Sequence, residues 1–219
     1  MKVVSNFFKL SALFALVLFV SCSNDDDEPN MPIEGTDNIV ETAIGTADLS
    51  SLVAALQKAD ESANNDLITA LSGEGPFTVF APTNAAFADL LAQLDGFDSL
   101  DDFNSEALQD VLATILEYHV VVGTAARSTD LSDGQTLTTL QGSTITVSTD
   151  GGVFLDDATM VNAEVTTANV VTTNGIVHVV DKVLLPQAIL DELADIILVS
   201  ITDLAIGNDN LERLVAALT

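Results

Sequence analysis

The spacing of apolar residues changes once along this chain, near Tyr118, and this change constrains the fold more than any other feature. Before Tyr118, three segments carry apolar residues at i, i+3, i+4 and i+7, which places one apolar stripe on a helix. These stripes are Leu49, Leu52, Val53 and Leu56; Phe87, Leu90, Leu91 and Leu94; and Leu108, Val111, Leu112 and Ile115. The first half of the folded region is therefore predicted to be mainly helical.

Local signals add detail to this helical half. Asp48 is predicted to cap the first helix, because a carboxylate accepts hydrogen bonds from free first-turn amides. Residues 66–71 are compatible with a further short helix, and the aromatic and β-branched residues 77–80 predict a short buried strand. Thr83 or Asn84 is then expected to cap the helix that follows.

After Tyr118 the apolar pattern has period 2, which is typical of strands. Asp150-Gly151 and Asn174-Gly175 are expected to form tight hairpin turns, the second with the positive φ of a type I′ turn. The close spacing of short strands favours a small sandwich or barrel over a parallel sheet. The fold class is therefore α+β, with its helices mostly first. The predicted strands are 120–122, 135–140, 143–149, 153–155, 169–173 and 176–180.

The N-terminus has the composition of an export signal. Lys2 and Lys9 give the start a positive charge, and residues 10–20 form a run of 11 uncharged residues, all apolar except Ser11, about half of the roughly 20 that span a membrane. The single cysteine, Cys22, follows at once. Residues 19–22 (Phe-Val-Ser-Cys) resemble a bacterial lipobox, although Leu is usual at the place of Phe19. Residues 1–21 are therefore a predicted lipoprotein signal peptide and Cys22 a predicted lipidation site; the alternative is ordinary secretion.

Residues 22–36 are acidic and contain two prolines, so they are expected to form a disordered tether. The acidic run at 25–28 also resembles the signal that sends some Gram-negative lipoproteins to the outer face of the outer membrane. If Cys22 is acylated, two acyl chains suffice for stable membrane attachment. The expected location is thus the outer membrane, lipid-anchored and exposed at the cell surface.

Composition excludes several classes of function. With 33 acidic and 6 basic residues, the formal charge of −27 argues against nucleic-acid binding, which needs clustered Lys and Arg. One cysteine excludes an internal disulfide, and two histidines leave no set of ligands for a Cys/His zinc site. The Asp-rich stretches 25–27 and 98–102 lack the ligand spacing of an EF-hand. No cofactor and no metal are expected.

The end of the chain repeats its beginning. Residues 201–218 align without gaps on residues 39–56, with ten of 18 positions identical at an offset of 162 residues. This offset is the size of a domain, not of a solenoid repeat. Residues 187–219 are therefore predicted to hold a linker and the truncated start of a second module. Without a core of its own, that last helix is expected to be marginal.

Three segments together resemble the fasciclin domain family. Residues 78–87 (TVFAPTNAAF) are similar to its first signature, Tyr118-His119 to its central motif, and residues 174–186 (NGIVHVVDKVLLP) to its second signature. The resemblance covers 37–186 and implies a β-sandwich or wedge covered by helices, common in tandem in secreted adhesion proteins. One departure is Asn169, where the family usually has Asp, which puts a ligand role there in doubt.

The histidines are the candidate site residues. Tyr118 and His119 continue the apolar stripe of the preceding helix, which favours a core pair hydrogen-bonded to backbone. The family resemblance instead implies partner binding, because the Tyr-His segment is implicated in cell adhesion. His178 alternates with Ile176 and Val180, which is typical of a packed strand residue.

Two functions from different classes follow. The first is a lipid-anchored, non-catalytic adhesion module, one of a tandem array that contacts a protein or glycan. The second is a carrier of a small ligand such as haem, or a hydrolase, using His119 or His178. No Gly-x-Ser-x-Gly, His-Glu-x-x-His or Walker A pattern occurs, so no catalytic residues are predicted. A structural spacer is a third possibility.

Overall fold

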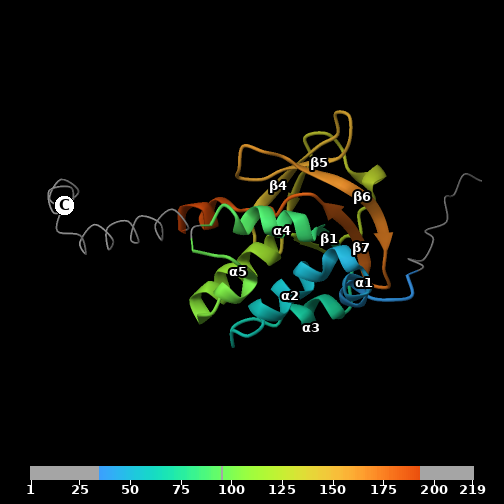
Figure 1. Cartoon of the computed structure of the whole chain (residues 1–219). Coiled ribbons are helices and arrows are strands. Elements are labelled where there is room, and N and C mark those ends of the chain that lie inside the picture. Colours follow the sequence, from blue (N-terminus) through green and yellow to red (C-terminus); the bar gives the residue numbers. More distant parts are fainter. Residues whose placement is uncertain (1–34, 95, 193–219) are drawn as a thin grey trace, which may run out of the picture. The chain divides into compact units, whose positions relative to one another are not determined.

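A computed structural model describes residues 35–94 and 96–192 of the 219-residue chain (Figure 1). The predictions for the signal peptide 1–21, for Cys22 and for most of the tether 22–36 lie outside these residues. So does the predicted start of a second module at 198–219.

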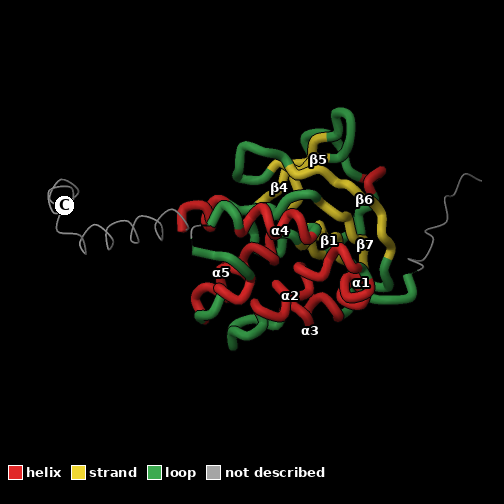
Figure 2. Tube along the Cα trace, in the orientation of Figure 1, coloured by secondary structure: helices red, strands yellow, loops and turns green. Residues whose placement is uncertain are grey.

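The described chain contains five complete α-helices, three short 3-10 helices and seven strands, and residues 187–192 are also helical. The helices are α1 (Ile39–Gly45), η1 (Ala47–Leu49), α2 (Ser50–Ala59), α3 (Leu67–Ser72), α4 (Asn84–Leu91), η2 (Leu100–Asp102), α5 (Glu106–Tyr118) and η3 (Ser128–Asp130). The strands are β1 (Phe77–Pro82), β2 (Val120–Val122), β3 (Thr136–Thr138), β4 (Thr144–Ser148), β5 (Phe154–Asp156), β6 (Ala163–Val171) and β7 (Gly175–Val180). The α-helices lie together on one side of the strands, whereas η3 lies beside β6 (Figures 1 and 2).

Side-chain caps begin three of the α-helices: α1, α4 and α5. The Thr83 hydroxyl accepts a hydrogen bond from the Ala86 amide and begins α4, as predicted. The Asp48 prediction is wrong, because Asp48 lies in η1 and its side chain caps no helix. Instead, Asn84 reaches across from α4, where its Oδ1 accepts the Ser51 amide at 2.7 Å. Helix α1, which the apolar stripes did not reveal, begins with a capping box between Asn38 and Glu41.

The seven strands form one mixed sheet in the order β2-β1-β7-β6-β5-β4-β3. The α+β class is confirmed. Contrary to the expectation from strand spacing, one pair is parallel: β1 runs alongside β7, with Phe77 opposite Gly175 and Pro82 opposite Val180. All other neighbours are antiparallel. The sheet curls until its two edges meet, because the Leu140 amide, just past β3, donates a 2.7 Å hydrogen bond to the Val120 carbonyl in β2.

The curled sheet separates two hydrophobic cores. On one face, alternate residues of β1 such as Val79 and Ala81 pack with the apolar stripes of α1, α2 and α5. On the other face, Phe80 and Val180 pack against inward residues of β4 and β5, among them Ile145. Within the described residues no single helix is long and apolar enough to cross a membrane; α1 and residues 47–59, bent by 107°, pass that test only as a pair.

The two predicted hairpins are present, but their turns differ from the prediction. Residues 149–153 join β4 to β5 with Gly151 at φ 81°, so the connection is longer than a two-residue turn. Between β6 and β7, neither Asn174 nor Gly175 has a positive φ, so the type I′ prediction is wrong. Gly175 is required for another reason: a Cβ there would collide with the carbonyl oxygen of Phe77 on the paired strand β1.

This close approach gives a testable contrast between two glycines. Gly175→Ala is expected to lower the free energy of unfolding by at least about 2 kcal/mol, because β1 and β7 must separate to admit the methyl group. Gly45→Ala, where nothing lies within 4 Å of the added Cβ, is expected to be neutral or stabilising by up to about 1 kcal/mol. Urea denaturation of both variants measures the difference. Equal stability of the two variants would contradict the argument.

Candidate functional site

Tyr118 and His119 end helix α5 and are both buried, each 2% exposed. The Tyr118 hydroxyl donates to the Thr144 carbonyl at 2.9 Å. His119 Nδ1 lies 2.7 Å from the Ile115 carbonyl, and His119 Nε2 accepts the Leu184 amide at 2.8 Å. This pattern requires the neutral tautomer with the proton on Nδ1. The pair thus has the contacts of core residues, and a partner can reach it only through neighbouring surface.

Burial also sets the protonation of this pair. It lowers the pKa of the His119 imidazole to about 4, so the ring is neutral at pH 7. It raises the pKa of the Tyr118 hydroxyl to about 12, and the nearby Asp157 carboxylate acts in the same direction. Both side chains therefore remain uncharged at physiological pH, consistent with their place in the interior.

His178 lies in the middle of β7 and is fully buried, with its ring stacked on Phe80 at a centroid distance of 5.7 Å. Its Nε2 is 2.9 Å from the Ala126 carbonyl, and its Nδ1 accepts the Asn169 amide at 3.4 Å. Burial lowers the pKa of this imidazole as well. His178 is therefore a packed strand residue, as its alternation with Ile176 and Val180 predicts.

Asn169 uses both atoms of its amide side chain. Its Oδ1 accepts the Ser128 amide at 2.7 Å, and its Nδ2 donates to the Ser128 hydroxyl at 2.8 Å. It also has a φ of 63°, the left-handed region that Asn tolerates better than most residues. At this position, where the family usually has Asp, the residue connects β6 to η3 through the protein's own hydrogen bonds.

Neither histidine is placed to act as a base or as a ligand. All four ring nitrogens have hydrogen-bond partners in the fold, so use of either imidazole would first break a buried contact. The cavity that His119 lines measures about 20 Å³, close to the space of one water molecule and far too small for haem. Across 35–94 and 96–192, no three His, Cys, Asp or Glu side chains are grouped to hold a metal ion. The carrier or hydrolase alternative therefore gains no support.

A buried ion pair, which the sequence did not reveal, lies beside Tyr118 and His119. The Lys182 ammonium contacts both carboxylate oxygens of Asp157 at 2.9 and 3.0 Å, and the Asp157 side chain is fully buried. The Leu185 amide donates to Asp157 at 2.9 Å, next along the chain from the Leu184 amide that donates to His119. The usable signal was a single lysine inside the apolar run 176–185.

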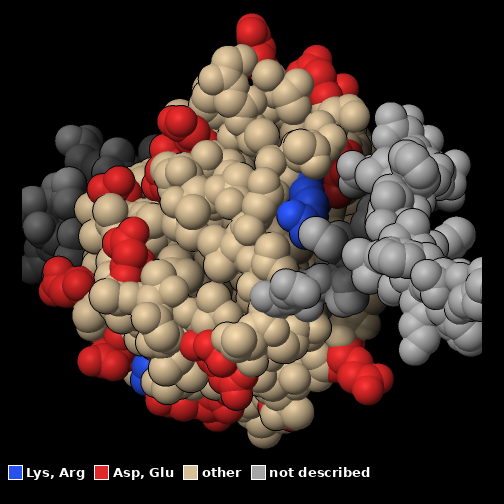
Figure 3. Space-filling model, turned by 90° about the vertical axis from the view of Figure 1, so that its right-hand side faces the viewer, with Lys and Arg blue, Asp and Glu red and all other residues tan. Residues whose placement is uncertain are grey.

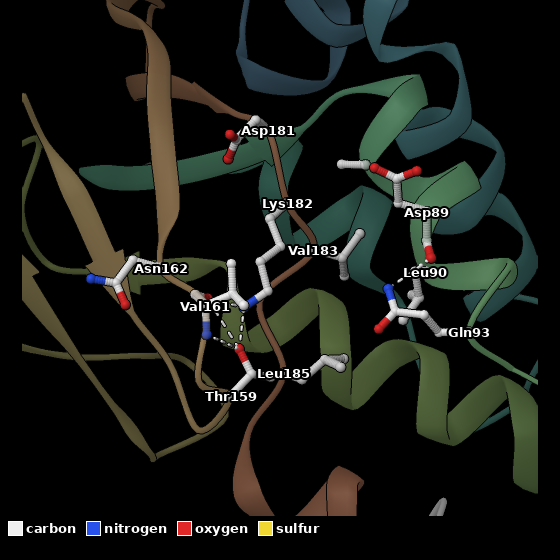
Figure 4. Close-up of a pocket in the computed structure, with 11 residues that line it drawn as sticks. Asp89, Leu90, Gln93, Thr159, Val161, Asn162, Asp181, Lys182, Val183 and Leu185 are labelled. Carbon is white, nitrogen blue, oxygen red and sulfur yellow. Dashed lines mark hydrogen bonds between the residues drawn. The ribbon is translucent and has the colours of Figure 1, made fainter.

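The same lysine holds a surface loop. Lys182 donates to the Thr159 hydroxyl and to the Val161 carbonyl, so the loop 157–162 is fastened at its base (Figure 4). The tip is apolar and open: Met160 is fully exposed and Val161 is 66% exposed. We call residues 157–162 the Met160 loop.

A cavity of about 350 Å³ opens beside the Met160 loop. Lys182 and Val183 lie between the loop on one side and the α4 residues Asp89, Leu90 and Gln93 on the other (Figure 4). The site thus combines an apolar projection, a hollow lined by apolar, amide and carboxylate groups, and an ion pair with a buried carboxylate that connects the loop to the segment 182–185. It resembles a recognition surface more than a catalytic centre, because its one ammonium group is already engaged.

Comparison with known proteins identifies the fold. The fasciclin domain model matches residues 47–186. The chain is 42% identical over 151 residues to "Protein sll1483" of Synechocystis sp., covering 68% of this chain and 73% of that protein. It is 34% identical to the immunogenic protein MPB70 of Mycobacterium bovis over 69% of this chain and 70% of that one.

Two further relatives are longer than this chain. Human periostin is 31% identical over 78% of this chain, which spans only 20% of periostin. Among solved structures, a FAS1 domain pair from the insect cell adhesion molecule Fasciclin I superposes with a TM-score of 0.59 at 18% identity, covering 71% of this chain and 53% of the pair. The signatures at 78–87 and 174–186, the α+β fold and these matches agree, and the chain belongs to the fasciclin domain family.

Proposed function

We propose that this protein is a lipid-anchored extracellular adhesion module that binds a protein or glycan partner through the Met160 loop and the adjoining cavity. Its membership of the fasciclin family supports this proposal, as does its structural similarity to a domain pair from a cell adhesion molecule. The observation that carries it is the exposure of Met160 and Val161 on a loop fastened by the part-buried Lys182.

Exposed apolar side chains that are adjacent to each other and to a cavity are typical of interaction surfaces. Here the loop is also tied to the rest of the fold, because Lys182 binds Thr159 and Val161 while Asp157 binds the Leu185 amide. A preorganised loop loses less conformational entropy on binding, which leaves more of the contact energy as affinity.

Tyr118 and His119 are buried, and we propose that they support this surface from the interior. His119 holds the Leu184 amide and Asp157 holds the neighbouring Leu185 amide, so both fix the segment that carries Lys182. The partner binding expected of the Tyr-His segment is therefore proposed to be indirect. On this view the pair positions the binding surface, and the Met160 loop makes the contact.

The proposal also includes a membrane anchor at Cys22 and a second module. Residues 19–22 support acylation of Cys22, and the acidic residues 25–28 support display on the outer face of the outer membrane. The likeness of 201–218 to 39–56 supports a second module after this one. Two modules joined by a short linker raise the effective concentration of the second binding event, so weak single contacts gain avidity.

One experiment with three variants tests anchoring and adhesion separately. Bacteria displaying the full-length protein are fed labelled palmitate, and their adhesion to an array of matrix proteins and glycans is counted. We expect Cys22→Ser to abolish both label and adhesion. Met160→Asp is expected to keep the label and lower adhesion at least tenfold, because a charge replaces the apolar tip.

Ile44→Asp is the matched control. Ile44 is an exposed apolar residue of α1 that lies outside this surface, and its exposed fraction of 64% is similar to the 66% of Val161 in the Met160 loop. It is expected to keep both label and adhesion. Label on the Cys22→Ser protein would refute the anchor. Equal adhesion of the Met160→Asp and unchanged proteins would refute the contact surface.

A further inference from the structure

A second cavity, of about 250 Å³, lies between the helices and the sheet, away from Lys182. We call it the α1–β6 cavity. Interiors of proteins are close-packed, with few voids larger than a water molecule, so an opening of this size requires a structural cause. Its lining residues are Ile39, Thr42, Ala43, Thr46, Asp48, Leu49, Leu52, Val79, Ala81, Thr166, Thr167, Val170, Val177 and Val179.

The cause is an irregularity in β6. From Val165 to Val170 strand β6 advances five residues, while its partner β7 advances three, from Val180 to Val177. Asn169, with its φ of 63° and its two hydrogen bonds to Ser128, fixes the irregular segment. Bulges of this kind bend a strand and redirect its side chains. The cavity is thus built into the backbone, and close packing of the side chains does not remove it.

The side chains that line the α1–β6 cavity determine which small molecules fit it. Its inner wall is aliphatic, formed by residues such as Val79 and Val177. Four threonines and one charged residue, Asp48, complete the lining, and no Lys or Arg is among them. Asp48 is exposed, at the rim of the cavity. Figure 3 views the side on which α1, β6 and β7 lie in Figure 1; most charged side chains around its uncharged centre are Asp and Glu, and basic side chains also lie on this face.

Charge and volume together define one class of ligand. The Asp48 carboxylate attracts a cation and repels an anion, and the large negative charge of the chain acts in the same direction. An apolar cavity of about 150 Å³ holds a benzene ring, so this larger one accepts a chain of roughly six to eight carbons. We infer that the α1–β6 cavity binds a small aliphatic amine, with its hydrocarbon against the sheet and its ammonium group at Asp48. This site is independent of the proposed adhesion surface.

Three probes with one hydrocarbon chain and different head groups test the inference. Hexylammonium, hexanol and heptanoate, each with a six-carbon alkyl chain, are titrated at pH 7 into the full chain, and methyl NMR signals of Ile39, Val79 and Val177 are followed. Saturable shifts are expected, with a millimolar or lower dissociation constant for hexylammonium. Heptanoate is expected to bind at least about tenfold more weakly, because its carboxylate faces Asp48.

Two variants separate the head-group contact from general attraction to an acidic protein. Asp48→Asn is expected to weaken the binding of hexylammonium until its affinity is about that of hexanol. The affinity for hexanol itself is expected to stay unchanged. Asp150→Asn removes the same charge from the exposed β4–β5 connection, outside the cavity lining, and is expected to change nothing. The inference is overturned if the methyl groups of these three residues show no saturable shift, if heptanoate binds as tightly as hexylammonium, or if the Asp48→Asn protein still prefers hexylammonium to hexanol.

Discussion

Lys182→Met is expected to lower the free energy of unfolding by about 3 kcal/mol, because it leaves the fully buried Asp157 carboxylate without its cation. The Met160 loop would also lose the donor that bonds Thr159 and Val161. Urea denaturation followed by circular dichroism measures the change, and the midpoint and slope together give the free energy.

The chain provides a matched control in its other ion pair within the described residues. Lys58 and Glu61 are also 2.9 Å apart, but the Glu61 side chain is 54% exposed. Lys58→Met is therefore expected to cost less than about 1 kcal/mol. The double variant Lys182→Met with Asp157→Leu is expected to recover part of the loss, since no charge remains buried. A Lys182→Met protein as stable as the Lys58→Met protein would show that burial of Asp157 is unimportant.

Acidification is expected to destabilise the protein by about 3 kcal/mol between pH 6.5 and pH 4 through His119 alone. The imidazole has a pKa of about 4 in the fold and 6.5 when exposed, so in this range the unfolded chain binds the additional proton. The contribution is fully present above pH 6.5 and is lost as the pH falls. A protonated ring would place an N–H against the Leu184 amide, which now donates to it.

Comparison with His119→Gln isolates this contribution. The variant is expected to be less stable at pH 7 but to lose less stability on acidification, because glutamine does not titrate. In this variant His178 still makes the protein less stable at low pH, since burial lowers the pKa of its imidazole too. Glu117 acts in the opposite direction, because burial raises the pKa of its carboxyl. Urea denaturation from pH 7 to pH 4.5 gives the free energy of unfolding against pH for each protein. Equal slopes for the two proteins would rule out titration of His119.

The features that could be predicted from the sequence depend mostly on residues that are close together in the chain. The stripe through Leu108 and Leu112 fixed a face of α5, and Thr83 capped α4, because both depend on residues within one or two turns. The parallel pairing of β1 with β7 joins segments nearly a hundred residues apart, and strand spacing carries no information about it. The reason for Gly175 also lies across that pairing, at Phe77.

The candidate site shows the same limit. The sequence indicated that Tyr118, His119 and His178 are chemically distinctive, and alternation predicted the packing of His178 correctly. It did not reveal that Asp157 pairs with Lys182, because acidic residues are abundant and nothing local distinguishes this one. Nor did it reveal the α1–β6 cavity, which depends on a register shift between β6 and β7. Sites formed by long-range register become visible only in the fold.

The hydrogen bond from the Leu140 amide to the Val120 carbonyl has a consequence for contacts between copies of this protein. An open sheet offers unpaired backbone groups to any neighbouring strand, which is a common route to aggregation. Here the first and last strands turn toward each other, and β2 is only three residues long. A second copy therefore finds little free strand to add to, so a high local concentration, such as the proposed anchoring would produce, need not lead to fibrous self-assembly.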